Sequence, residues 1–269
     1  MAFEVRYRTE RQGLGQMNEK NSEGGCKRCR DKEPLGIDIS MAFQPIVELP
    51  SGRIFAHEAL VRGVNGEPAG EVFKYVDDDN LYQFDQTCRI KAIELAARIG
   101  VQSHVSINFM PNAVYQAETC IQRTLEAADR YGLPLENIIF EVTEADRVLD
   151  RNHLRNILEY YKKRGFKTAI DDFGDGYAGL NLMADFVPDL VKLDMGLIRD
   201  IDSDKQRHLI VRHIVRLCEE LGPRVIAEGV ETRAERDTLR DLGVDLFQGY
   251  YFAKPAFEAK AALDPESLK

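Results

Sequence analysis

Short runs of β-branched and aromatic residues alternate along the chain with longer stretches in which apolar residues recur every three or four positions. The short runs predict strands and the longer stretches predict amphipathic helices. The predicted strands are Met41–Val47, Ile54–Leu60, His104–Phe109, Asn137–Val142, Lys167–Asp171, Asp189–Leu193, Arg224–Ala227 and Asp245–Gln248. The clearest predicted helices are Asp85–Ile99, Glu118–Tyr131, Asp150–Arg164, Asp204–Leu221 and Thr232–Leu242. This alternation is typical of the α/β class and predicts a TIM-like (β/α)8 barrel.

The connection between the first two predicted strands is too short for a regular barrel. Only residues 49–53 separate them, whereas a crossover between parallel strands needs about a dozen residues or more. These strands must therefore form an antiparallel hairpin. We expect an irregular barrel in which the first strand is antiparallel to the rest.

Composition narrows the class of protein without identifying it. The chain has 269 residues, of which 44% are hydrophobic and 30% charged, so general disorder is excluded. A net charge of −9 argues against a duplex nucleic acid as partner, because phosphate binding needs clustered Lys and Arg. No apolar run approaches the roughly 20 residues of a membrane span. We expect a soluble cytoplasmic protein without a membrane partner.

The first 38 residues differ from the rest of the chain. They are polar, contain Gly24-Gly25 and show no sustained periodicity, so we predict a flexible extension over 1–38 and a single domain over 39–269. Cys26 and Cys29 form the only Cys-x-x-Cys pair. A structural zinc site usually needs two such pairs. The pair is therefore either two free thiols or a metal or redox element completed by another chain.

Polar residues stand at the carboxyl ends of the predicted strands, where barrels of this type place their active sites. They are Glu58, Asn108, Glu141, Asp171, Asp172, Lys192, Asp194, Glu228 and Gln248. Carboxylates about 4 Å apart repel each other by about 4 kcal/mol per pair at an effective dielectric constant near 20. The acids therefore hold protons or cations, unless they simply pair with helix N-termini and surface Arg. Oxygen ligands favour Mg²⁺ or Mn²⁺, and adjacent Asp171 and Asp172 can serve two ions at once.

Glu58-Ala59-Leu60-Val61-Arg62 resembles the signature of EAL-domain phosphodiesterases, which hydrolyse cyclic di-GMP. The likeness covers residues 41–256, and its further motifs follow in family order. They are Phe43-Gln44-Pro45-Ile46, Ile107-Asn108-Phe109, Glu141-Val142-Thr143-Glu144, Asp171-Asp172-Phe173-Gly174, Val191-Lys192-Leu193-Asp194, Ala227-Glu228-Gly229-Val230-Glu231 and Gln248-Gly249-Tyr250. An ordered set of this length is far more specific than the three letters alone.

The resemblance implies a role for each matching residue. One Mg²⁺ or Mn²⁺ ion would be held by Glu58, Asn108, Glu141 and Asp171, and a second by Asp171, Asp172 and Glu228. Lys192 would orient or deprotonate the attacking water or neutralise phosphate charge, with its pKa pulled down by the ions and up by the acids. Glu58 and Glu228 would also take part in catalysis. The substrate would contact Gln44, Leu60, Arg62, Asp194 and Gln248, and the product would be linear 5′-pGpG.

The family also suggests supporting residues and partners. Glu144 would anchor the glycine-rich loop 172–180, and Glu231 would lie behind the metal ligands. Asp175 stands where the family usually has a small or hydroxyl residue, and we expect it to face solvent. A homodimer is expected, and a protein regulator is left open. Two other functions remain: a catalytically silent cyclic di-GMP receptor or protein-interaction module, and an enzyme acting on another phosphodiester or a sugar phosphate.

Overall fold

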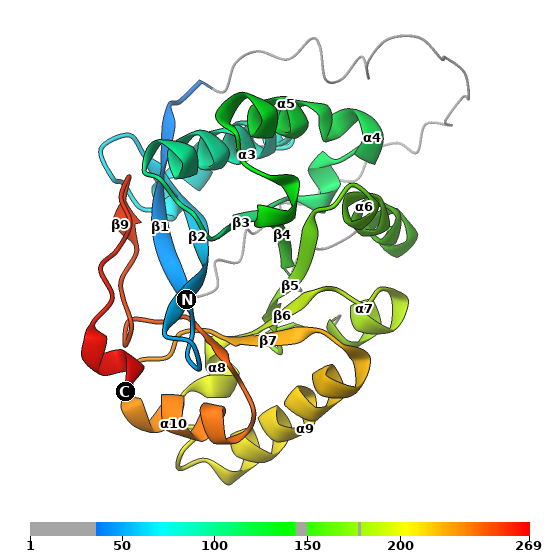
Figure 1. Cartoon of the computed structure of the whole chain (residues 1–269). Coiled ribbons are helices and arrows are strands. Elements are labelled where there is room, and N and C mark those ends of the chain that lie inside the picture. Colours follow the sequence, from blue (N-terminus) through cyan, green and yellow to red (C-terminus); the bar gives the residue numbers. More distant parts are fainter. Residues whose placement is uncertain (1–35, 144–149, 177–178) are drawn as a thin grey trace.

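The computed structural model describes residues 36–143, 150–176 and 179–269, which form a closed barrel of strands surrounded by helices (Figure 1). The barrel strands are β1 (Ile39–Glu48), β2 (Arg53–Gly63), β3 (His104–Asn108), β4 (Ile138–Thr143), β5 (Lys167–Phe173), β6 (Leu190–Leu193), β7 (Arg224–Ala227) and β8 (Leu246–Phe247). Strands β2 to β8 pair in parallel in chain order, and β1 closes the barrel as the antiparallel neighbour of both β2 and β8. The predicted irregular barrel is therefore confirmed.

The hairpin of β1 and β2 brings two polar residues into register. Gln44 pairs directly with Glu58, and the register shifts between Ile46 and Val47. Residues directly opposite each other on antiparallel strands project from the same face of the sheet. The hairpin thus places Gln44 and Glu58 side by side.

The longer helices lie where the sequence pattern predicts them, although the first of them begins at Leu81, four residues before the predicted start at Asp85. They are α3 (Leu81–Arg98), α5 (Gln122–Tyr131), α6 (Arg151–Lys163), α9 (Lys205–Leu221) and α10 (Arg233–Asp241). Asp150 and Asp204 cap α6 and α9 by accepting hydrogen bonds from backbone amides of the first turn. Thr232 and Glu235 form a reciprocal capping box at the start of α10.

The short elements were not predicted. They are α2 (Ala69–Val72), α4 (Ala117–Cys120), α7 (Gly179–Asp185), α8 (Met195–Ile198), β9 (Ala256–Phe257) and the 3₁₀ turns η1 (Phe73–Tyr75), η2 (Pro111–Ala113), η3 (Leu135–Asn137) and η4 (Pro265–Leu268). The predicted helix Glu118–Tyr131 is in fact divided between α4 and α5 at Ile121. Strand β9 lies against β1 as an additional antiparallel strand outside the barrel order. These unpredicted helices have at most seven residues, too few for a helical period to register, and β9 has only two.

The barrel interior contains an apolar layer. It takes one buried side chain from every strand except β3, and its members are Ile46, Ala56, Ile139, Ala169, Leu190, Ile226 and Leu246. A second and larger apolar core fills the space between the barrel and its helices. This inner layer fills the barrel, so a site on the barrel axis lies above it, toward the carboxyl ends of the parallel strands.

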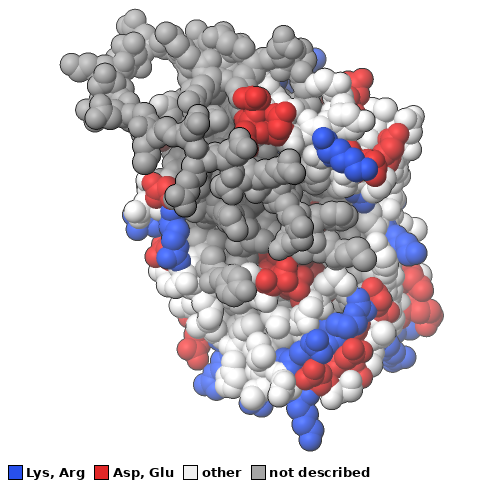
Figure 2. Space-filling model, turned by 180° about the vertical axis from the view of Figure 1, so that it is seen from behind, with Lys and Arg blue, Asp and Glu red and all other residues white. Residues whose placement is uncertain are grey.

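The described surface carries both signs of charge. On the face in Figure 2, Lys and Arg side chains are interspersed with Asp and Glu. The described residues on this face do not gather Lys and Arg into one concentrated basic patch. Among the described residues, the helices are all too short or too polar to cross a lipid bilayer.

Candidate active site

A polar layer lies one step above the apolar layer on the barrel axis. Because side chains on one face of a strand recur every second residue, each apolar residue is followed two positions later by another inward-pointing residue. On the parallel strands these are Glu58, Glu141, Asp171, Lys192, Glu228 and Gln248. Strand β3 contributes Asn108, two positions after the polar Ser106, and the antiparallel β1 contributes Gln44, two positions before Ile46. Strand order and alternation alone therefore bring the predicted residues together.

Lys192 lies at the centre of this layer. Its Nζ is 2.7 Å from Glu228 Oε1, 2.9 Å from Asp171 Oδ1, 3.0 Å from Glu141 Oε2 and 3.7 Å from Glu58 Oε2. The lysine side chain is only 1% exposed. One buried cation thus faces four carboxylates. In the described part of the chain these four pair with Lys192, rather than with helix N-termini or surface Arg as the alternative interpretation required.

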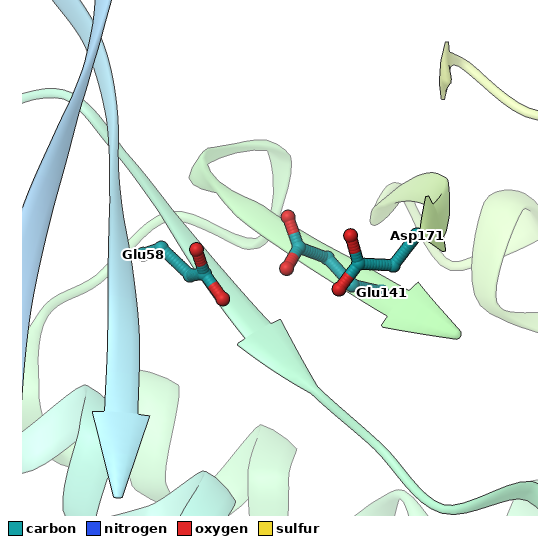
Figure 3. Close-up of side chains that lie close together, drawn as sticks. All are labelled: Glu58, Glu141 and Asp171. Atoms are coloured by element: carbon teal, nitrogen blue, oxygen red, sulfur yellow. The ribbon is translucent and has the colours of Figure 1, made fainter. Parts of the chain in front are cut away.

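The carboxylates form two overlapping groups. Glu58, Glu141 and Asp171 make one, and Asp171, Asp172 and Glu228 make the other. In each group, one oxygen atom from every residue lies within 4.8 Å of the others. Figure 3 shows the side chains of the first group turned toward one another from β2, β4 and β5. Asn108 Nδ2 donates to Glu58 Oε1 at 3.1 Å, which places the asparagine beside the first group. Asp171 is the shared member, as the resemblance implied.

Burial and mutual repulsion make several of these acids reluctant to ionise. Burial, with repulsion from Glu58 and Asp171, raises the pKa of Glu141 to about 8 against the opposing effect of Lys192. Burial and Asp171 raise the pKa of Asp172 to about 7, and they also raise that of Glu228 well above its usual value. Burial lowers the pKa of Lys192, but the surrounding carboxylates outweigh it and the net pKa is well above 10.5. A divalent cation would relieve this repulsion.

The affinity for Mn²⁺ is expected to rise between pH 6 and pH 8. Asp172 and Glu141 hold protons below pKa values of about 7 and 8, and a carboxylate must lose its proton before it ligates a metal. Each proton released strengthens binding by about tenfold per pH unit below the pKa of its group. Titrations of the protein with Mn²⁺ at pH 6, 7 and 8 measure this dependence. An affinity independent of pH over this range would contradict the assignment of these acids as ligands.

Neutral side chains fix the orientation of two carboxylates. Ser106 Oγ donates to Glu141 Oε1 from the buried strand β3. Gln248 Nε2 donates to Glu58 Oε2 at 2.6 Å, and to Gln44 Oε1 at 3.3 Å. Ser106 was missed in the sequence, although it points inward two residues before Asn108 and alternation would have identified it.

The backbone at Asp172 is strained. Its φ of 51° lies in the left-handed region, which costs a non-glycine residue about 1–3 kcal/mol and is concentrated at functional sites. The amide nitrogen of Asp172 donates to Asp171 Oδ1 at 2.9 Å. The turned backbone lets two successive residues contribute to the same carboxylate group.

The polar layer forms part of the lining of a cavity of about 580 Å³, a volume typical of small-molecule sites. All five predicted substrate-binding residues line it: Gln44, Leu60, Arg62, Asp194 and Gln248. Burial lowers the pKa of half-buried Arg62, and Tyr250 and Glu58 partly offset this. Asp194 also caps α8, where it accepts from the amide nitrogen of Gly196 at 2.7 Å.

Other predicted residues lie outside the carboxylate groups. Glu231 lines the cavity and pairs with Arg199 at 2.8 Å, so its place behind the metal ligands stays a prediction. Asp175 is exposed and is not among the lining residues, which agrees with the expected solvent-facing position. Glu144, Cys26 and Cys29 lie outside the described residues, so their roles and the domain boundary at residue 38 also stay predictions.

Residues 35–255 match the EAL domain in a comparison with protein families. Among curated proteins of Escherichia coli, the chain is similar to the blue light- and temperature-regulated antirepressor BluF (31% identity over 81% of this chain and 54% of BluF). It is also similar to the cyclic di-GMP phosphodiesterase PdeF (30% identity over 79% of this chain and 29% of PdeF). The chain thus spans about half or less of the length of these curated relatives.

Solved structures show the same architecture. A standalone versatile EAL protein from Vibrio cholerae, in its c-di-GMP-bound form, is 55% identical with a TM-score of 0.85, over 87% of this chain and 99% of that one. The manganese and cyclic di-GMP complex of BlrP1 from Klebsiella pneumoniae is 34% identical with a TM-score of 0.80, over 85% of this chain and 58% of that one.

Proposed function

The chain belongs to the EAL domain family, and on that basis we propose that it is a metal-dependent phosphodiesterase that hydrolyses cyclic di-GMP to linear 5′-pGpG. The observation that carries the proposal is the pair of overlapping carboxylate groups that share Asp171 beside a substrate-sized cavity. The name of PdeF and the ligand in the Vibrio cholerae structure support the choice of substrate.

The donor atoms fit two Mg²⁺ or Mn²⁺ ions. Carboxylates and an amide offer the hard oxygen ligands that these ions prefer, and the described cluster sets five acids against one lysine. In addition, Gln248 Oε1 has no hydrogen-bond partner in the described part of the chain. Glu58, Asn108, Glu141 and Asp171 would hold the first ion, and Asp171, Asp172 and Glu228 the second. When bound, such ions make a coordinated water more acidic and offset negative charge on the phosphate.

Lys192 would act as a cation at this site. Its raised pKa keeps the ammonium group charged in the metal-free protein, which favours roles in orienting water and neutralising phosphate over that of a general base. Hydrogen bonds from neighbouring residues hold Glu58 and Glu141 in fixed orientations for the same chemistry. We assign catalytic roles to Glu58, Lys192 and Glu228.

The remaining cavity would hold the dinucleotide. Arg62 is a half-buried cation in the lining and is suited to a phosphate oxygen. Gln44, Leu60, Asp194 and Gln248 would surround a guanine base and its ribose. We also propose a homodimer and leave open a protein regulator, both from the family resemblance.

A catalytically silent receptor of the same fold is the second candidate. The observation that favours it is the similarity to BluF, whose name describes an antirepressor. The complete set of acids and the lysine favours the enzyme, because a receptor does not need them for catalysis. Hydrolysis of other phosphodiesters or sugar phosphates is the third candidate, and it predicts no preference for cyclic di-GMP.

Removal of divalent ions is expected to abolish hydrolysis. Purified protein is incubated with cyclic di-GMP and Mg²⁺ or Mn²⁺, with and without excess EDTA, and the products are separated by chromatography. We expect linear 5′-pGpG that disappears with EDTA and in the Glu58→Ala variant. Tight binding of cyclic di-GMP without turnover would support the receptor instead, and faster cleavage of simple aryl phosphodiesters would support the third candidate.

A further inference from the structure

A buried ion pair lies beside the proposed active site but outside its carboxylate groups. Asp85 and Arg89 are one turn apart on α3, and their side chains are 1% and 0% exposed. Arg89 Nη2 is 2.7 Å from Asp85 Oδ2. The metal chemistry proposed above uses neither residue.

Asp85 is connected to the end of β3. Its Oδ1 accepts a hydrogen bond from the backbone nitrogen of Met110 at 2.9 Å. Met110 comes two residues after Asn108, and Asp85 itself borders the cavity. The carboxylate of Asp85 therefore holds α3 against the backbone that immediately follows a proposed metal ligand.

Arg89 is connected to the neighbouring strand and helix. Its guanidinium carbon lies 5.4 Å from the centre of the Phe109 ring and 5.1 Å from that of Phe140. Phe109 directly follows Asn108, and Phe140 directly precedes Glu141. Arg89 Nη1 also donates to the hydroxyl of Tyr161 on α6 at 2.9 Å. One buried guanidinium thus contacts a residue adjacent to each of two proposed ligands.

A buried ion pair is a weak source of stability, because removing both charges from water offsets most of their attraction. Well-packed apolar side chains of similar volume are often as stabilising. A charged pair does add geometric specificity, because its hydrogen bonds fix the relative placement of the elements that it joins. Here those elements are α3, the end of β3 and α6, with Phe140 of β4 packed against the guanidinium.

We propose that Asp85 and Arg89 are positioning residues that set the geometry of Asn108 and Glu141 for the first metal ion. Asp85 acts through the backbone of Met110, and Arg89 acts through the rings of Phe109 and Phe140. This inference rests on one part of the proposed function, which is that the site binds a metal. Its test therefore uses Mn²⁺ alone, without substrate.

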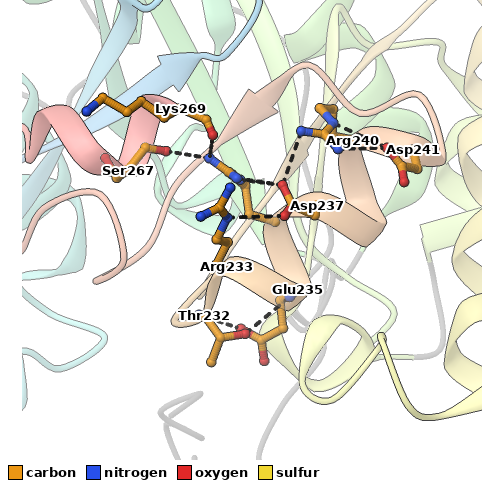
Figure 4. A network of polar contacts seen from close by, with 9 residues as sticks. Thr232, Arg233, Glu235, Asp237, Arg240, Asp241, Ser267 and Lys269 are labelled. Atoms are coloured by element: carbon orange, nitrogen blue, oxygen red, sulfur yellow. Dashed lines mark hydrogen bonds and ion pairs between the residues drawn. The ribbon is translucent and has the colours of Figure 1, made fainter.

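The test replaces the pair by neutral side chains in two ways. Asp85→Leu with Arg89→Met keeps the volume but removes the acceptor for Met110. Asp85→Asn with Arg89→Met is equally uncharged but keeps an amide oxygen that can accept from Met110. Arg236→Met is the matched control, because Arg236 is also 0% exposed. Its guanidinium donates at 3.0 Å to the carbonyl oxygens of Ser267 and Lys269 and pairs with Asp237, rather than contacting residues beside Asn108 or Glu141. Figure 4 shows the polar network that links α10 to these C-terminal residues.

Mn²⁺ affinity of the full chain is measured by electron paramagnetic resonance of the free ion, and thermal unfolding in EDTA reports stability. The Leu/Met variant is expected to bind Mn²⁺ about 10- to 100-fold more weakly, the range typical of lost support behind a metal ligand. The Asn/Met variant is expected to recover the part of that affinity that depends on the acceptor for Met110, and to stay several-fold below wild type because Arg89 is still missing. Arg236→Met is expected to retain wild-type affinity whatever its melting temperature.

Wild-type affinity in a folded Leu/Met variant would overturn the proposal. So would an equal loss in Arg236→Met, which would indicate a general effect of stability. If the Leu/Met variant does not fold, the Mn²⁺ affinities of the Asn/Met variant and of the single variant Asp85→Asn are compared instead. Asp85→Asn keeps the acceptor and is expected to bind Mn²⁺ within a few-fold of wild type. Wild-type protein that binds Mn²⁺ but does not hydrolyse cyclic di-GMP would contradict the proposed function and leave this comparison valid.

Discussion

Replacing Asp171 by asparagine is expected to slow hydrolysis of cyclic di-GMP by about 10³-fold or more. Asp171 is the one residue that belongs to both carboxylate groups, and it lies 2.9 Å from Lys192. Asparagine keeps the acceptor for the amide of Asp172 but removes the charge. Loss of the shared ligand weakens the binding of both ions. A loss of several kcal/mol of charge stabilisation in the transition state corresponds to about three powers of ten in rate.

The measurement is kcat at saturating Mn²⁺, with circular dichroism to check the fold. Asp175→Asn is the matched control, because this carboxylate follows only four residues later but is exposed and does not line the cavity. We expect the control to keep kcat within about twofold of wild type, since isolated surface changes usually have small effects. An Asp171→Asn variant within tenfold of wild-type activity would refute the shared-ligand assignment.

Lys192→Met is expected to lower stability in a way that depends on metal. Removal of the lysine leaves buried carboxylates without their cation, and breaking a buried ion pair in this way costs about 3–5 kcal/mol. The acids can take up protons to limit this cost, since the pKa of Glu141 is already about 8 and that of Asp172 about 7. The raised pKa values mean that stability is lost as pH rises, so the loss in EDTA should be larger at pH 9 than at pH 6. Saturating Mn²⁺ should restore most of it.

The same substitution should reduce kcat by about 10²- to 10⁴-fold in the Mn²⁺-loaded protein, the range typical of a lost group that handles protons or orients water. Thermal unfolding in EDTA and in Mn²⁺ separates the stability effect from this catalytic one. Lys74→Met, at a side chain 65% exposed on η1, is the control and should change neither quantity. An equal loss of stability with and without Mn²⁺ would show that a bound cation does not replace the charge of Lys192 among the carboxylates.

Strand alternation made much of the site predictable. Glu141 and Glu228 stand near the ends of recognisable strands, while Glu58 lies in the middle of β2. The parallel order of these strands brings the three side chains to the same level of the barrel. The antiparallel first strand was also predictable, because five residues cannot span a crossover. The fold therefore follows from local patterns combined with simple limits on connections.

Other parts depend on contacts that no local pattern encodes. Asp85 reads in the sequence only as the start of a helix, and nothing in its spacing links it to Met110. Arg89 looks like an ordinary helical arginine until β3 and β4 place Phe109 and Phe140 around it. The break at Ile121 has no marker in the sequence pattern, and the two-residue strand β9 is defined by its pairing with β1.

We propose that two divalent ions share the carboxylate of Asp171, and anomalous scattering from a crystal grown with Mn²⁺ and cyclic di-GMP would locate them. Two manganese peaks are expected beside Asp171, one held by Glu58, Asn108 and Glu141 and the other by Asp172 and Glu228. Full occupancy by cyclic di-GMP with no manganese peak among these residues would contradict this proposal.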